Sequence, residues 1–134
     1  AERKISQDQA CQLLGIGQAF FEMITSDAAI SVQRVMMAPE TDERLRELFW
    51  QAGPERTCEA LADFLRARTA RGELDIPDCR LAGQQFLTLI KGEVHMHRMC
   101  GMPLSPGQCD ASSHVPDSVD FFLRAYAPRG SGSA

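Results

Sequence analysis

The residues best suited to chemistry lie at positions 95 to 102, where the sequence reads His-Met-His-Arg-Met-Cys-Gly-Met. Imidazoles, thioethers and a thiol are ligands that suit copper(I) or zinc. On a helix His95 can share a face with Met99, and His97 with Cys100. However, the two histidines would point about 200° apart, so an unbroken helix cannot bring both to one ion. We therefore predict no metal site, and we keep His95, Met99 and Cys100 as candidates for a metal- or thiol-responsive sensor.

The sequence shows no arrangement typical of an enzyme or of a cofactor site. Catalysis needs a nucleophile with a base, paired acids or a metal with convergent ligands, and none of these occurs at a recognisable spacing. Gly15-Ile16-Gly17 lies within a helical pattern and lacks the third glycine of a dinucleotide-binding loop. We expect a protein without enzymatic activity and without a cofactor.

Composition indicates one globular domain that does not itself bind nucleic acid. The 134 residues are 44% hydrophobic and 24% charged, with a net charge of -4. This charge does not suit phosphate backbones. Five cysteines without a C-x-x-C pair favour reduced thiols, and no apolar run approaches the ~20 residues that span a bilayer. We expect a cytoplasmic protein with no membrane partner.

Apolar residues recur at helical spacing along most of the chain, and no segment alternates like a strand. We predict an all-α, single-domain bundle of about six helices and no sheet. The predicted helices cover residues 6–24, 28–37, 42–52, 54–71, 79–100 and 116–127, with a flexible tail over 128–134.

Several residues predict where these helices begin and end. Ser6 with Gln9 forms a capping box, Thr41 and Asp78 are N-caps of the third and fifth helices, and Gly101 ends the fifth. We expect Leu45, Leu48 and Phe49 to form the buried face of the third helix. The segment 101–115, rich in Pro, Gly and Ser, is predicted to be a long loop.

The fifth helix is apolar on more than one side. Leu81, Phe86, Leu89, Ile90 and Met96 cover too much of its circumference for one buried stripe. A second apolar face needs a partner, so we predict self-association.

Aromatic and methionine side chains could line an apolar cavity between helices, although each could equally be part of the core. The candidates for ligand binding are Phe20, Met23, Met36, Phe49, Trp50, Phe64, Phe86 and Ile90. One or two polar residues on or near the apolar faces could orient a ligand, from the set Gln18, Glu22, Gln33, Arg34 and Gln85.

The chain resembles the C-terminal domain of TetR/AcrR-type transcriptional regulators, in particular the AefR-like branch. The resemblance rests on Glu43-Arg44-Leu45-Arg46-Glu47-Leu48-Phe49-Trp50-Gln51-Ala52-Gly53-Pro54. It continues through Ala60-Leu61-Ala62-Asp63-Phe64-Leu65, Arg71-Gly72-Glu73-Leu74, Leu81-Ala82-Gly83-Gln84-Gln85-Phe86-Leu87 and Lys91-Gly92. Together these segments cover about half of the chain. Pro77 and the long 101–115 segment depart from the family's pattern.

The resemblance implies that residues 1–127 are the effector-binding and dimerisation domain of a repressor whose N-terminal helix-turn-helix domain is absent here. It implies a homodimer in which the last two helices pack against those of the partner as a four-helix bundle. The dimer-interface candidates are Gln85, Leu89, Gly92, Met96, Phe121, Phe122 and Tyr126. A small apolar effector would release operator DNA, which only the N-terminal domain contacts.

Two alternatives remain open beside the apolar effector. The chain could be a pure dimerisation module with a solidly packed interior, or the metal- or thiol-responsive sensor considered above.

Overall fold

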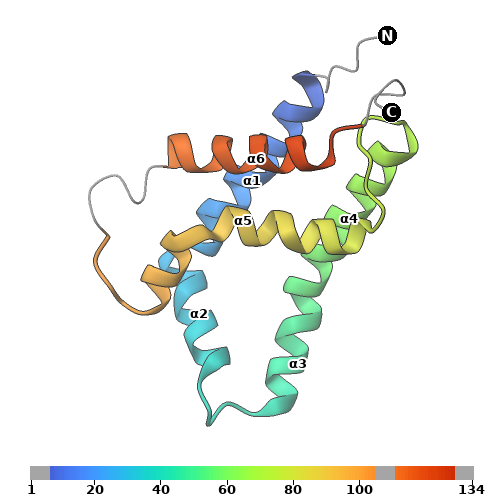
Figure 1. Cartoon of the computed structure of the whole chain (residues 1–134). Helices are drawn as coiled ribbons and strands as arrows, with labels where there is room; N and C mark the ends of the chain where they lie inside the picture. Colours follow the sequence, from blue (N-terminus) through green and yellow to red (C-terminus); the bar gives the residue numbers. More distant parts are fainter. Residues whose placement is uncertain (1–6, 105–110, 129–134) are drawn as a thin grey trace.

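A computed structural model describes residues 7–104 and 111–128, and every regular element in these two ranges is a helix (Figure 1). The helices are α1 (Gln7–Ile24), α2 (Asp27–Met37), α3 (Glu43–Ala52), α4 (Pro54–Ala70), α5 (Cys79–Met99) and α6 (Ala111–Tyr126). The predicted all-α class is confirmed. The expected capping residue Ser6 and the tail residues 129–134 lie outside the described ranges.

α3 and α4 meet without a loop. Gly53 both ends α3, where its N–H donates to the Phe49 carbonyl at 3.1 Å, and begins α4, where its carbonyl accepts from Thr57 N–H at 3.0 Å. Pro54 occupies the first turn of α4, where a missing N–H costs nothing. If α3 and α4 are counted as one helix, the described residues form five helices, whereas about six were predicted.

Short polar side chains cap the N-termini of α2, α3 and α5. Ser26 Oγ accepts from Ala29 N–H at 3.2 Å at the start of α2, and Asp78 Oδ1 accepts from Leu81 N–H at 3.0 Å at the start of α5, as predicted for Asp78. The predicted cap Thr41 is wrong. Asp42 caps α3 through Arg44 N–H at 2.9 Å, because the Thr41 hydroxyl instead donates to the Val35 carbonyl.

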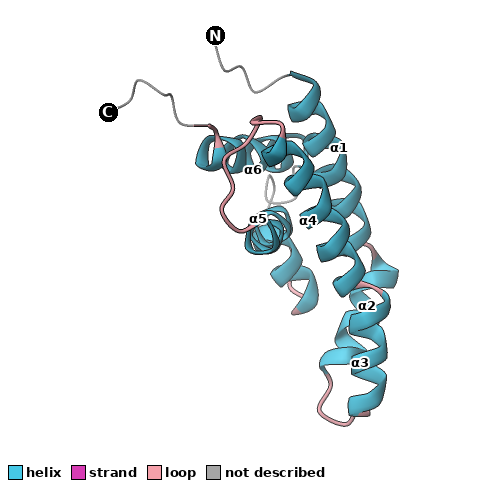
Figure 2. Cartoon of the chain, turned by 90° about the vertical axis from the view of Figure 1, so that its right-hand side faces the viewer, coloured by secondary structure: helices cyan, strands magenta, loops and turns pink. Residues whose placement is uncertain are grey.

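The helices form two layers around one core. α5 and α6 lie side by side in one layer, and α1 and α4 lie behind them (Figures 1 and 2). Between the layers, Phe86 and Phe122 meet edge to face with ring centroids 5.1 Å apart. Leu13 and Leu65 are fully buried beside them. This packing supplies most of the apolar burial and holds the four helices together.

α2 and α3 extend away from this core, and α3 is mostly exposed. Leu45 and Leu48 are 48% and 52% exposed, and no residue of α3 is fully buried. The predicted buried face of α3 is therefore wrong. Its apolar pattern is real, but no element of the described chain packs closely enough to cover it.

α6 begins at Ala111, five residues before the predicted start at Pro116. Proline normally marks the first turn of a helix because it lacks an N–H. Here the preceding turn is held by tertiary contacts, since Val115 is fully buried in the core and the His114 ring hydrogen-bonds to α5. The predicted loop is correspondingly shorter, and its residues 105–110 lie outside the described ranges.

α5 is not the single straight helix that was predicted, because it breaks at Gly92. Gly92 has φ +54° and ψ -161°, a conformation that is essentially reserved for glycine. After the break the helix continues to Met99 and ends as predicted at Gly101, where φ is +67° and Met102 N–H donates to the His97 carbonyl at 2.9 Å.

In the described part of the chain no helix is both long enough and apolar enough to cross a membrane.

Candidate ligand-binding and dimerisation sites

The break in α5 is filled by a side chain of α6. His114 Nε2 lies 2.9 Å from the carbonyl oxygen of Ile90, so this nitrogen must carry the proton and donate it. The His114 ring also packs against Phe21 of α1, with centroids 5.6 Å apart. His114 of α6 thus holds the break, and Phe21 of α1 packs against the His114 ring.

Beyond the break, His95 is bound to α2. His95 Nε2 lies 2.7 Å from Gln33 Oε1. The Gln33 amide nitrogen already donates to the carbonyls of Ile24 and Ala29, at 3.2 and 3.0 Å, which leaves its oxygen as acceptor. His95 must therefore donate from Nε2, and its Nδ1 keeps a free lone pair when the ring is neutral. Burial lowers the pKa of His95 below its ordinary value, and the nearby positive charge of Lys91 adds to this effect.

Arg34, the residue after Gln33, binds the end of the same helical segment. Its Nε donates to the Met99 carbonyl at 3.1 Å, and its Nη2 donates to the Arg98 carbonyl. A guanidinium at a helix C-terminus satisfies carbonyls that have no partner within the helix and complements the helix dipole. Gln33 and Arg34 together attach α2 to the part of α5 that follows the break.

A hollow of about 320 Å³ lies at this junction. Most of its lining side chains are soft donors or apolar groups, namely Arg34, Met37, Ala38, His95, Met96, Met99 and Cys100. The Cys100 thiol lies 3.9 Å from the Met96 sulfur. The structure thus brings the sequence candidates His95, Met99 and Cys100 to one hollow, whereas His97 does not line it.

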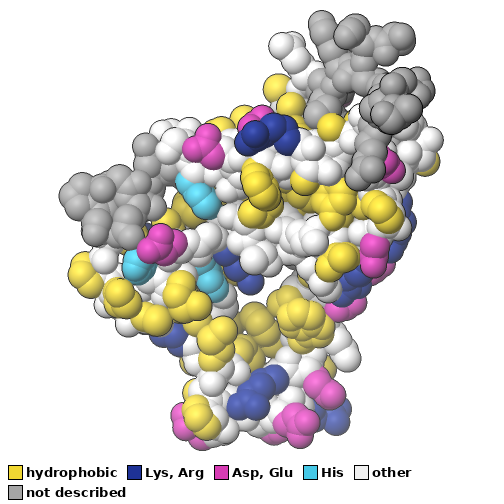
Figure 3. All heavy atoms as spheres, in the orientation of Figure 1, with side chains coloured by type: hydrophobic (Ala, Val, Ile, Leu, Met, Phe, Trp, Pro, Cys, Tyr) yellow, Lys and Arg dark blue, Asp and Glu magenta, His cyan; other side chains and the backbone are white. Residues whose placement is uncertain are grey.

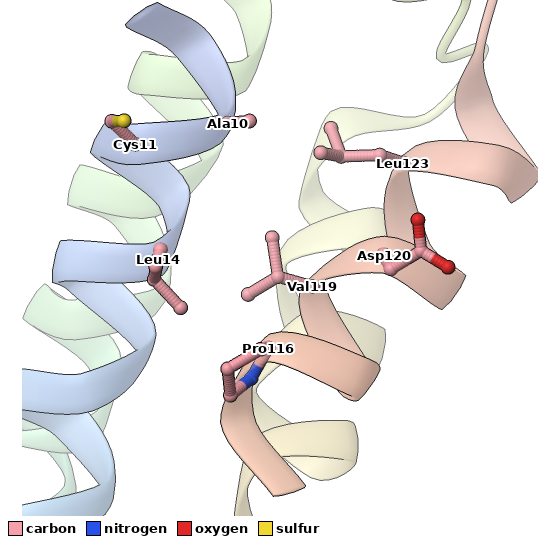
Figure 4. Close-up of a pocket in the computed structure, with 7 residues that line it drawn as sticks. All are labelled: Ala10, Cys11, Leu14, Pro116, Val119, Asp120 and Leu123. Atoms are coloured by element: carbon pink, nitrogen blue, oxygen red, sulfur yellow. The ribbon is translucent and has the colours of Figure 1, made fainter. Parts of the chain in front are cut away.

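A second hollow of about 210 Å³ runs between α1 and α6. Leu14, Pro116 and Val119 point toward one another across it, while the carboxylate of Asp120 points away from α1 (Figure 4). Ala10, Cys11 and Leu123 complete the lining. This open, apolar groove offers little for fixing the orientation of a ligand.

The predicted ligand-binding residues do not gather around one cavity. Phe86 and Ile90 are fully buried in the core, and Phe20 and Phe64 pack against it. Met36 and Phe49 are half-buried on α2 and α3. Met23 and Trp50 are exposed, and the Trp50 indole donates to Glu55 at 3.0 Å. Hydrophobic side chains nevertheless line the opening between α2 and the joined helices α3 and α4 (Figure 3).

Most of the predicted dimer-interface residues lie on the α5–α6 layer. Phe121 is 56% exposed, and Leu89 is half-buried. Gln85 of α5 accepts a hydrogen bond from the Tyr126 hydroxyl of α6. Phe122 differs from these, because it is buried against Phe86 in the core. Gly92 lies at the break in α5, and Met96 lies beyond it, beside the hollow at the α2–α5 junction.

The sequence reasoning missed two features of this region. His114, which fills the break, lay in the predicted loop, and Met37, which lines the hollow, was not a candidate. An isolated glycine inside a helical pattern was the available signal for the break. The three histidines of the chain gather around this part of the molecule (Figure 3).

Comparison with protein families gives one match. The family model for the C-terminal domain of AefR-like transcriptional repressors matches residues 11–128. No curated protein and no solved structure was found to match the chain. The match begins within α1, extends past the end of α6 and includes both the α2–α5 junction and the α5–α6 layer.

Proposed function

Since the chain belongs to the TetR family as an AefR-like repressor C-terminal domain, we propose that it forms a homodimer and senses a small apolar effector. Effector binding would favour a conformation in which the repressor releases its operator. The operator would be contacted by a separate helix-turn-helix domain, consistent with the net charge of -4 on these 134 residues. An effector acts in this way only through its different affinities for the two conformations.

The exposed face of α5 and α6 carries the proposal of a homodimer. One side of this layer packs on α1 and α4, and no described element covers the other side (Figure 2). Leu81 of α5 and Phe121 of α6 are large apolar side chains on these two helices, 46% and 56% exposed. A second copy of the layer would cover such side chains and complete a four-helix bundle.

Light scattering over a range of concentrations tests the dimer. We expect a mass of about twice 14.8 kDa for the natural sequence. Phe121→Glu should give a monomer, because a carboxylate would be buried without a partner at the interface. The matched control is Val35→Glu, a similarly exposed position on α2 at 53%, which should remain dimeric. A natural sequence that is monomeric at every concentration would contradict the proposal.

The exposed apolar side chains of α2 and α3 support an apolar effector. Val32, Val35 and Met37 of α2 and Leu45 and Leu48 of α3 are all exposed, and the opening between the two helices is lined by hydrophobic groups (Figure 3). A ligand that enters there would remove apolar surface from water at about 25 cal/mol per Å². We therefore place the effector between α2 and α3, with Met36 and Phe49 among its contacts.

Thermal unfolding in the presence of an apolar compound library tests the effector. A compound that binds the folded state raises the unfolding temperature by mass action. Leu48→Asn should abolish the shift caused by a binding compound, whereas Leu81→Asn, on the face assigned to the dimer, should leave it in place. If no compound shifts the temperature while the dimer persists, the chain is instead a dimerisation module with a packed interior.

A further inference from the structure

The hollow between α2 and the end of α5 combines soft donors at positions 95 to 100 that the proposed effector does not use. Residues 95, 96, 99 and 100 line it together, because their spacing places them within about 140° on one side of a helix. Met37 of α2 contributes a further thioether. The hollow thus has four donors from the end of α5 and one thioether from α2 around one space.

His95 has the hydrogen-bonding pattern of a metal ligand. Histidines that bind metals usually donate their other ring N–H to an oxygen acceptor, which fixes the tautomer and the ring orientation. Gln33 Oε1 is this acceptor at 2.7 Å, and both donors of the Gln33 amide are occupied by carbonyls. Nδ1 has no protein partner in the described part of the chain, so its lone pair is available.

The sulfur atoms have a spacing that suits a soft ion. With metal–sulfur bonds of about 2.3 Å, two sulfur ligands at 120° lie about 4 Å apart. Cys100 Sγ and Met96 Sδ are 3.9 Å apart. Harder ions are disfavoured, because no group of three or more His, Cys, Asp or Glu side chains in the described ranges could hold one.

The charge of the surroundings favours a monovalent ion. The hollow contains one thiol and the guanidinium of Arg34, and none of its lining residues is acidic. A monovalent ion on the Cys100 thiolate gives a neutral pair, whereas a divalent ion would keep a positive charge near Arg34. Thiolates and thioethers select copper(I) among such ions.

We propose that this hollow binds one copper(I) ion through the Cys100 thiolate, the Met96 and Met99 thioethers and His95 Nδ1. On binding, the Cys100 thiol loses its proton to solvent and a sulfur–copper bond forms, without any change of oxidation state. Gln33 acts as a positioning residue that holds the His95 ring. Leu48 and Phe121, the residues that test the effector and the homodimer, do not line this hollow, so the copper site can be tested separately from both.

Competition with a coloured copper(I) chelator, without oxygen and with a reductant, tests the site. The full chain should take one copper(I) per chain. Cys100→Ser and the double change Met96→Leu with Met99→Leu should each weaken binding by on the order of 100-fold, and Gln33→Leu by about 10- to 100-fold. Cys100 and Met96 are exposed, so these variants should fold, as far-UV circular dichroism would verify.

The matched controls are Cys11→Ser and Met23→Leu, which replace an exposed thiol and an exposed thioether of α1. Both should bind copper(I) as the natural sequence does. X-ray absorption at the copper edge should show sulfur ligands together with one nitrogen ligand, and the nitrogen should disappear in His95→Phe. The proposal is overturned if copper(I) does not bind, if Cys100→Ser binds it unchanged, or if Cys11→Ser weakens binding equally.

Discussion

His114 of α6 occupies the space that a side chain at position 92 of α5 would need. A Cβ built on Gly92 would lie 2.6 Å from His114 Cε1 and 2.9 Å from its Nε2, while the same Nε2 donates to the Ile90 carbonyl at 2.9 Å. The break in α5 and the first turns of α6 therefore depend on each other. This relationship fixes the direction of the segment that carries His95, Met96, Met99 and Cys100.

Gly92→Ala should destabilise the fold. The backbone at this position has φ +54°, which costs a residue with a Cβ about 1–3 kcal/mol, and the clash with His114 adds to that cost. Urea unfolding at one fixed protein concentration measures the effect, because the stability of an oligomer depends on concentration.

Gly15→Ala is the matched control for this substitution. Gly15 lies within α1, and a Cβ there would meet nothing within 4 Å. Alanine should stabilise the helix by about 1 kcal/mol. Equal effects of the two glycine substitutions would show that the break at Gly92 is not required by the fold.

His114→Phe should also destabilise the protein, because it leaves the Ile90 carbonyl without its donor. Phenylalanine keeps an aromatic ring near Phe21 but cannot donate a hydrogen bond, so we expect a loss of about 1–3 kcal/mol in the free energy of unfolding. Hydrogen exchange of the amides of residues 90–99 should increase at the same time. Unchanged exchange in this segment would argue against His114 as the residue that holds the break.

Leu65→Ala and Leu48→Ala should differ sharply in stability. Leu65 is 0% exposed in the core, and its truncation should cost about 2–5 kcal/mol through lost burial and a remaining cavity. Leu48 of α3 is half exposed, and its truncation should change stability by no more than about 0.5 kcal/mol. Chemical denaturation of both variants checks this contrast, and a large loss in Leu48→Ala would show that α3 is covered in solution.

The stability of the fold should fall as the solution becomes mildly acidic, partly because of His95. Burial, with Lys91 as the second cause, lowers the pKa of His95 in the folded state, so protonation is favoured in the unfolded chain. The stability contributed by neutral His95 is complete above an unfolded pKa of about 6.5 and is lost as the pH falls through the lower folded pKa. Unfolding curves between about pH 5 and pH 8 should show a shallower decline in His95→Gln than in the natural sequence. Identical slopes would remove His95 as a cause.

Helix boundaries could be predicted where the deciding residues are neighbours in the chain. Ser26, Gly53-Pro54, Asp78 and Gly101 each act on backbone groups within a few residues, so their effects can be read without the fold. Prediction failed at Pro116 and along α3 for the same physical reason. The first turn of α6 is held by the buried Val115 and the bound His114. Leu45 and Leu48 of α3 stay exposed because no described element packs over them.

The sequence by itself determined the all-α class, most helix ends and the family, because periodicity, caps and a family's residue pattern are local or linear properties. Tertiary structure alone decided the break at Gly92 and the composition of the hollow. His95 meets Gln33 across 62 positions of the chain, and the His114 that fills the break lies 24 positions from Ile90. Such pairs depend on how helices pack, and packing is set by neighbours that the order of residues does not reveal.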